Sequence, residues 1–466
     1  MKHIKQLSKI STYQPSSGPL LTLYDLALKG LSREEIFDHF RDRGSNYFNV
    51  ILSRLKSKLL EGVLFYPFND HAEHLTRSLA AYNEFSVCLR LLRTGNKIVG
   101  LSETEKVLTK TIDLGMTGCA LMLAIELEIY YSTIGNYSKY KKYAALSDDL
   151  KKEFDREIAI QKIFNELAFS IKKKLPKEDI LEKLTAFKKE MPGQFYRSNL
   201  FYFSAWNLWH RFHENKPAII QTCQEATQFF NQFKTPIPFT TRWNFMRQMI
   251  PIYVAEKKYP EAAVMAKRCV KLCTEGNYNW HLSLIYLALV AFHNGKPKVA
   301  FQAYKTAHSV PMKFERVDDI QERWQLIRSY LSLYNLHVPG TFRLYKFLNS
   351  IPTLNADKSR NNVAVIISHL LHLWKAGERE QFGDLSKQLR RYIQRHLRKP
   401  GLERPRWFLM MLEKFYESNY HPVRYEPRVK ALWKKIQNTP SEISVNVLET
   451  EVIPIEVAWG MVVGEK

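Results

Sequence analysis

Residues 286–311 read "YLALVAFHNGKPKVAFQAYKTAHSVP", and this stretch decides the fold. An apolar run ends at the polar turn formed by residues 293–296. A second run then has apolar and aromatic side chains at helical spacing, at Ala300, Ala303, Tyr304 and Ala307, and stops at Pro311. The pattern predicts two short helices that fold back on each other as a hairpin.

The same apolar–turn–apolar pattern recurs along the chain. Polar breaks occur at Gly95, Gly135, Pro176, Asn215, Lys257, Gly295, His337, Gly377 and Asn419. Successive breaks are 38 to 42 residues apart. A lone hairpin cannot bury its apolar face, whereas stacked hairpins share one continuous core. The sequence therefore predicts an all-α fold, a right-handed α-solenoid of about nine helical hairpins with a period of about 40 residues.

The hairpin at 286–311 resembles a tetratricopeptide repeat. Leu287 and Ala288 stand where that motif has its Leu-Gly pair, and Pro311 falls one residue early. The repeat-packing positions are Gly295, Ala300, Tyr304 and Ala307. The small residues among them let the two helices approach closely, and the tyrosine fills the gap to the next repeat. The resemblance implies an array that presents a long concave surface to a protein, a peptide or a nucleic acid.

Other hairpins depart from the tetratricopeptide pattern. Five residues after the break, alanine is replaced by larger side chains, at Tyr140, Leu181, Ile220, Phe342 and Phe382. The step of about 40 residues also exceeds the 34 of that family. A degenerate tetratricopeptide-like array fits residues 69–438, and HEAT-like stacking is the alternative, with much the same expected shape.

Residues 19–68 do not keep this period and predict a separate three-helix unit, after a flexible stretch at 1–18. Ser32 and Glu35 have the spacing of a capping box at the start of the second helix. In the third helix, Phe48, Ile51, Leu52, Leu55 and Leu59 form one apolar stripe. One interpretation is a helical cap that closes the first repeat of the array.

The three-helix unit also resembles a helix-turn-helix, with "VLFYP" at 63–67 as a wing strand. In that interpretation, one face of the third helix reads base edges and phosphates, through Asn46, Asn49, Ser53, Arg54, Lys56 and Lys58. A helix-turn-helix joined to a tetratricopeptide-like array is similar in layout to certain bacterial peptide-sensing regulators.

Residues 439–466 change character. The stretch "SEISVNVLETEVIPIEVAWGMVVGEK" at 441–466 is β-branched and acidic, which predicts an extended tail. The tail is either flexible or folded back on the array. In the second case Glu449, Glu451 and Glu456 would meet a basic surface and compete with a partner.

Basic residues concentrate at 385–436, where fourteen Lys or Arg face four Glu. We expect a partner-binding or phosphate-binding face that comprises Lys387, Arg391, Arg395, Arg398, Arg404 and Arg406. The alternatives are a solvated helix face and a site for an acidic protein. The net charge of +23 likewise favours polyanionic partners, unless it only reflects a basic proteome.

Motifs of catalysis are not found in the sequence: it has no Gly-rich phosphate loop, no GxSxG and no HExxH. Cys269 and Cys273 are one helical turn apart but have no second pair nearby, so we expect core packing rather than zinc. His369 and His372 fall on an apolar helix and are expected in the core. Neither an enzyme nor a cofactor is predicted.

Composition narrows the class of protein further. The chain is 45% hydrophobic, too apolar for disorder. It has no apolar run of about 18 residues and no secretory leader, so no membrane association is expected. The five cysteines are scattered, as in a reducing compartment, which predicts a cytoplasmic location. The leading hypothesis is a non-catalytic binding or scaffold protein for a protein or peptide partner. The alternative is a nucleic-acid-binding transcriptional regulator.

Overall fold

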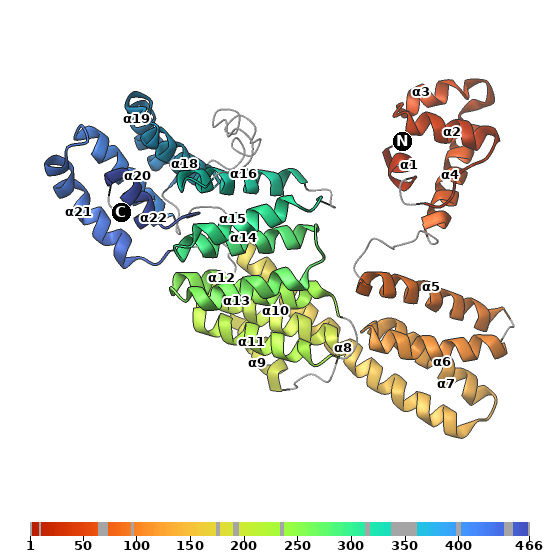
Figure 1. Cartoon of the computed structure of the whole chain (residues 1–466). Coiled ribbons are helices and arrows are strands. Elements are labelled where there is room, and N and C mark those ends of the chain that lie inside the picture. Colours follow the sequence, from red (N-terminus) through yellow and green to blue (C-terminus); the bar gives the residue numbers. More distant parts are fainter. Residues whose placement is uncertain are drawn as a thin grey trace. The chain divides into compact units, whose positions relative to one another are not determined.

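The computed structural model describes residues 2–8, 11–63, 73–94, 97–173, 178–189, 195–233, 237–312, 317–336, 361–397, 402–441 and 451–464 (Figure 1). Within these ranges every long regular element is an α-helix, so the chain is all-α there as predicted. The chain divides into two compact units, residues 1–154 and 155–466. The boundary falls inside helix α8 (Tyr137–Lys173).

Unit 1 begins with four helices that share a core of their own. They are α1 (Lys2–Leu7), α2 (Gly18–Leu28), α3 (Arg33–Asp38) and α4 (Gly44–Val63), with the short 3-10 turn η1 (Arg41–Arg43) before α4. Helix α1 lies in the stretch expected to be flexible, and its Ile4 is buried against the others. The predicted capping box is confirmed, because Ser32 Oγ accepts from the Glu35 backbone N–H and Glu35 Oε2 accepts from the Ser32 N–H.

The rest of unit 1 consists of α5 (Glu73–Arg93), α6 (Lys97–Asp113), α7 (Thr117–Thr133) and the first part of α8. Helix α5 packs against α6, and α6 packs against α7. The rings of Tyr131 on α7 and Tyr143 on α8 stack with centroids 5.6 Å apart. These contacts between sequence neighbours are those of helical hairpins.

Unit 2 continues the same pattern. After the end of α8 its helices are α9 (Glu178–Lys189), α10 (Tyr196–Phe212), α11 (Lys216–Asn231), α12 (Phe239–Ala255), α13 (Tyr259–Leu272), α14 (Tyr278–His293), α15 (Pro297–His308), α16 (Val317–Leu333), α18 (Asn361–Lys375), α19 (Arg379–His396), α20 (Glu403–Glu417), α21 (Pro422–Asn438) and α22 (Ile455–Val463). From α10 to α16, each helix contacts the next one in sequence. Alternate helices also touch, as α12 does α14 and α14 does α16, which is typical of a helical-repeat array.

The turns inside the hairpins fall at the predicted period. Their left-handed residues are Gly135, Glu214, Lys257, Gly295, Asn335, Gly377 and Asn419, with φ between 49° and 78°. Gly295 has φ of 65°, a region where an L side chain is strained. The predicted breaks Gly95, Pro176 and His337 lie outside the described residues.

Three of the four repeat-packing residues of the 286–311 hairpin lie in the core, and the fourth, Gly295, is exposed at the turn. Ala300, Tyr304 and Ala307 are buried on α15, and the Tyr304 ring packs edge-on against Trp324 of α16 at 5.8 Å between centroids. The small side chains therefore face α14 and α16, and the aromatic side chain fills the space toward the following helix, as the resemblance implied.

Helix α8 departs from the forty-residue period. The period predicts two helices between the breaks at Gly135 and Pro176, yet the structure has one helix of 37 residues. The reason is local, because residues 137–173 contain neither glycine nor proline and are rich in strong helix formers.

The C-terminal segment, defined as residues 451–464, also differs from the prediction. An extended tail was expected, but residues 455–463 form helix α22. Its buried side chains are Ile455, Ala458, Trp459 and Val462, at the spacing of one helical face. Packing of that face therefore outweighs the β-branched composition.

The cysteines are free thiols without disulfides. Four of them, Cys88, Cys223, Cys269 and Cys273, are buried, and Cys119 on α7 is half-buried. Burial raises the pKa of Cys223, Cys269 and Cys273 to about 12. Cys269 and Cys273 thus pack in the core, as expected.

Candidate functional site

The C-terminal segment is held inside unit 2 by helices distant from it in sequence. Helix α22 packs against α18 and α20 (Figure 1). The Trp459 ring meets the edges of Phe415 on α20 and Tyr425 on α21, with centroids 5.8 and 6.0 Å away. Aromatic packing of this kind anchors the apolar face of α22.

Arg404, at the start of α20, forms the polar centre of this contact. Its Nε donates to Glu451 Oε1 at 2.6 Å and its Nη2 donates to Glu451 Oε2 at 3.2 Å. Nη2 also donates to both carboxylate oxygens of Glu456, at 3.0 and 2.9 Å. Nη1 donates to the backbone carbonyls of Ile436 and Thr439. The forked guanidinium therefore joins the end of α21 to the C-terminal segment.

The two glutamates differ in exposure. The Glu451 side chain is 1% exposed, whereas that of Glu456 is 40% exposed. Burial raises the pKa of Glu451 to about 7, although the neighbouring Arg404 opposes this rise. Glu456 therefore lies at the solvent edge of the contact, and Glu451 lies at its closed end.

His293 holds the backbone of the same segment. This residue ends α14, and its Nε2 lies 3.1 Å from the Glu451 carbonyl oxygen, 158 positions away in sequence. A carbonyl oxygen only accepts, so Nε2 carries the proton. Burial lowers the pKa of His293 to about 4, which keeps the ring neutral and leaves Nδ1 as an unprotonated acceptor.

One member of the basic face predicted at 385–436, Arg404, is not at the surface. Arg404 was expected to be exposed, but its side chain is 4% exposed and is used internally. The correction has a physical reason: two carboxylates and two carbonyls offer the guanidinium all its hydrogen bonds inside the fold. The side chains of Arg391 and Arg395, and all of Arg398, lie outside the described residues.

Two other members of that prediction remain at the surface. Lys387 is exposed and donates to Asp384 at 3.1 Å on the same helix. Arg406 is half-buried, with its guanidinium 5.9 Å from the centre of the Trp407 ring. Arg390, which was not singled out from the sequence, instead bridges α19 to α20 through Glu413 and Glu417. Phosphate binding by Lys387 and Arg406 stays a prediction.

The polar face of α4 is exposed as the helix-turn-helix interpretation requires. Solvent reaches all five candidate residues, Asn46, Asn49, Ser53, Arg54 and Lys56, while the apolar stripe on the other side is buried. Asn49 Oδ1 accepts a hydrogen bond from Arg33 of α3 at 2.9 Å. Base reading by this face stays a prediction, and the wing expected at 63–67 lies outside the described residues from position 64 onward.

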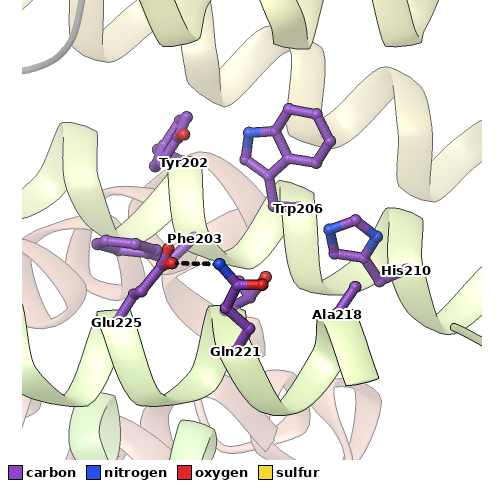
Figure 2. A pocket seen from close by; sticks show the side chains of 8 residues that line it. Tyr202, Phe203, Trp206, His210, Ala218, Gln221 and Glu225 are labelled. Atoms are coloured by element: carbon purple, nitrogen blue, oxygen red, sulfur yellow. Dashed lines mark hydrogen bonds between the residues drawn. The ribbon is translucent and has the colours of Figure 1, made fainter. Parts of the chain in front are cut away.

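A small pocket lies between α10 and α11. It has a volume of about 230 Å³ and is lined by Tyr202, Phe203, Trp206, His210, Ala218, Gln221, Thr222 and Glu225. Figure 2 shows Tyr202, Trp206 and His210 facing Gln221 and Glu225, with Gln221 Nε2 donating to Glu225 at 2.9 Å. Burial lowers the pKa of His210. A pocket of this size suits an amino-acid side chain rather than a large cofactor.

His369 and His372, expected in the core, lie on α18. His372 Nε2 lies 3.0 Å from the Ser329 carbonyl oxygen of α16, so it acts between helices. Among the described residues, no group of three or more His, Cys, Asp or Glu side chains is arranged to hold a metal ion. None of the described helices combines the length and apolar character needed to cross a bilayer.

Comparison of the chain with protein-family models, curated proteins and solved structures finds no match. The tetratricopeptide-like resemblance therefore stands on the repeat pattern and the packing of helical hairpins alone.

The roles of Arg404 and His293 were missed from the sequence. Arg404 was assigned to an exposed face because of its basic neighbours, and His293 was treated only as part of a turn. A partial signal existed in the sequence. The apolar residues 455, 458, 459 and 462 share one helical face, Glu451 lies just before this stretch, and Glu456 lies near its start.

Proposed function

We propose that this chain is a non-catalytic binding or scaffold protein, built as a right-handed tetratricopeptide-like solenoid, that binds a segment of a partner protein. One observation carries the proposal: unit 2 holds residues 451–464 of its own chain against α18 and α20 through a buried arginine and aromatic rings. Recognition of a short helix by an apolar groove with a few fixed polar groups is a common mode of peptide binding.

The recognition groups come from two distant parts of the array, helix α14 and the α20–α21 pair, which favours a binding surface over a local cap. His293 is on α14, Arg404 and Phe415 are on α20, and Tyr425 is on α21. A repeat array brings such residues together because each hairpin adds one row of side chains to the same surface.

The test is a selection of peptides from a displayed random library on the immobilised full-length chain. We expect enriched peptides that share a sequence pattern and bind with a dissociation constant in the range of about 1–100 μM, typical of short peptides on preformed grooves. Selection of unrelated peptides with no measurable affinity in solution would contradict the proposal.

A second candidate function is nucleic-acid binding by the three-helix unit, favoured by the exposed polar face of α4. Three phosphate contacts, by Arg54, Lys56 and Lys58, would weaken binding about 40-fold between about 50 and about 200 mM salt. Fluorescence anisotropy with mixed DNA and RNA fragments measures this, and Lys56→Ala should reduce the salt slope by about one. Lys298→Ala, at an exposed lysine of α15, is the matched control. A salt-insensitive or absent signal removes this candidate.

A further inference from the structure

The C-terminal segment has the properties of a bound peptide. Its backbone carbonyl at Glu451 is held by α14 and its two carboxylates by α20. Its apolar helix covers Phe415 and Tyr425. Each contact is made by a side chain of the array to a different part of the segment, so backbone, charge and apolar face are recognised separately.

The buried Arg404–Glu451 pair makes the contact selective for a segment with an acidic residue at this position. An ion pair in the interior gains little over an apolar pair of similar shape, because both charges lose their hydration. If the Glu451 carboxylate is removed, however, Arg404 stays buried with only the partly exposed Glu456 as a charge partner. The surface therefore discriminates strongly against a segment that has no acidic residue at this position.

Glu456 marks the edge of the contact that solvent reaches. Glu456 is 40% exposed and shares Arg404 Nη2 with Glu451, whereas the Arg404 side chain is 4% exposed. An incoming carboxylate therefore reaches the guanidinium only as Glu456 leaves this edge. The net charge of +23 also attracts acidic segments to the chain.

We propose that the surface formed by His293, Arg404, Phe415 and Tyr425 is a binding site for peptides with two glutamates five residues apart and a short apolar helix that begins one residue before the second glutamate. Residues 451–463 are its internal, exchangeable occupant. A partner protein with a segment of the same chemistry binds by taking their place. This inference rests on the proposed function and names the ligand class of that site.

The experiment uses the full-length chain with a protease recognition sequence placed within residues 442–450 and cut after folding. A fluorescein-labelled synthetic peptide of residues 449–466 is the probe, read by anisotropy. We expect the cut chain to exchange its segment for the probe. The uncut chain should bind the probe about 10- to 1,000-fold more weakly, because a tethered ligand has an effective concentration near the millimolar range and the expected dissociation constants are about 1–100 μM.

Two changes test the chemistry. At about pH 8, above the pKa of Glu451, the Glu451→Gln probe leaves the protein untouched and should bind the cut chain at least tenfold more weakly. It removes the buried carboxylate and leaves Arg404 only the partly exposed Glu456. Arg404→Gln in the chain should abolish the preference for glutamate over glutamine at position 451 of the probe. A probe with the same composition in scrambled order is the control and should not bind.

Three results overturn the inference: a cut chain that keeps its helical circular dichroism but never exchanges the probe, a chain that unfolds when cut, and a probe whose binding ignores Glu451→Gln. Library peptides that bind equally well to the wild type and to Arg404→Gln would overturn it too, and would leave the proposed function standing with its site elsewhere.

Discussion

Helices α7 and α14 show how differently one pattern is used in the two units. Each is an apolar helix that ends at a left-handed glycine, Gly135 or Gly295, and the two glycines are 160 positions apart. Ile125 and Ile129 of α7 thus correspond to Ile285 and Leu289 of α14. The first two are 40% and 57% exposed, whereas the second two are 0% and 1% exposed.

The difference lies in the neighbours, not in the helix. Helix α14 is in contact with α12, α13, α15 and α16, and its last residue, His293, also meets the C-terminal segment. Helix α7 has contacts with α5, α6 and the first part of α8, and leaves a row of apolar side chains, Met122, Ile125 and Ile129, exposed. Apolar spacing specifies which faces are suited to burial, and only tertiary packing decides which of them are buried.

The largest effect on stability should come from breaking the contact between Arg404 and Glu451, which holds the C-terminal segment beside α14. Arg404→Met leaves Glu451 buried without its charge partner, and we expect a loss of about 3–5 kcal/mol in the free energy of unfolding. Urea unfolding followed by circular dichroism measures it. The double variant Arg404→Met/Glu451→Leu should recover most of this loss, and a double variant as unstable as the single one would contradict the account of the pair.

The next effect compares the two helices directly. Ile285→Ala on α14 removes fully buried methylene and methyl groups and should cost about 2–5 kcal/mol. Ile125→Ala, the same substitution at the matching position of α7, should cost less than about 1 kcal/mol because that side chain is partly solvated. Equal losses in thermal or urea unfolding would show that α7 is covered in solution.

Acid should lower the stability of the fold through His293, the last residue of α14. Its pKa of about 4 in the fold lies below the ordinary value of 6.5, so the unfolded chain binds the proton more tightly and stability falls as the pH drops through that interval. Compared with pH 8, the loss at pH 5 is about 2 kcal/mol. Urea unfolding of His293→Gln at pH 8 and pH 5 measures this. The variant should lose less unfolding free energy between the two pH values than the wild type does, and the difference should be about 2 kcal/mol.

Glu451 has the opposite sign and serves as the control for His293. Its pKa of about 7 lies above the ordinary 4.5, so its contribution is present at low pH and is lost as the pH rises through 7. The variant Glu451→Gln should therefore be more acid-sensitive than the wild type. An unchanged pH profile in both variants would contradict the burial of this cluster.

The smallest effect on stability concerns the left-handed residue that occurs in the turn after α7, after α14 and after α12. Lys257 has the left-handed φ of 59° that glycine supplies at the ends of α7 and α14. Lys257→Gly should stabilise the chain by up to about 1 kcal/mol, whereas Gly295→Ala should destabilise it by about 1 kcal/mol. Thermal unfolding resolves the two signs, and a destabilising Lys257→Gly would show that the lysine side chain contributes more than its backbone strain costs.

The sequence was most informative where structure depends on nearby residues. The breaks at Gly135, Lys257, Gly295 and Gly377 predicted hairpin turns, and the capping box at Ser32 was confirmed, because a turn or a cap is decided within a few positions. The same locality explains the buried positions Ala300, Tyr304 and Ala307.

The partners in the candidate site were mostly out of reach of such reasoning. One alternative, a tail folded back with Glu451 and Glu456 against a basic group, agrees with their contacts to Arg404. Arg404 looks like its basic neighbours until Glu451, 47 positions later, is folded onto it. The C-terminal segment was predicted to be extended from its valines and isoleucines, although Ile455, Ala458, Trp459 and Val462 already had helical spacing. In both cases the deciding contact is between helices that no local pattern connects.

The five thiols provide a chemical measure of how often parts of the chain open locally. Only the thiolate of cysteine attacks an alkylating reagent or an aromatic disulfide, and a buried thiol with a pKa of about 12 is almost wholly protonated at neutral pH. Cys119 on α7 is half-buried and should be modified first, whereas Cys269 and Cys273 at the end of α13 must wait until the helices around them separate. The order and rates of thiol labelling thus report how often each unit opens, without any engineered cysteine or fluorophore.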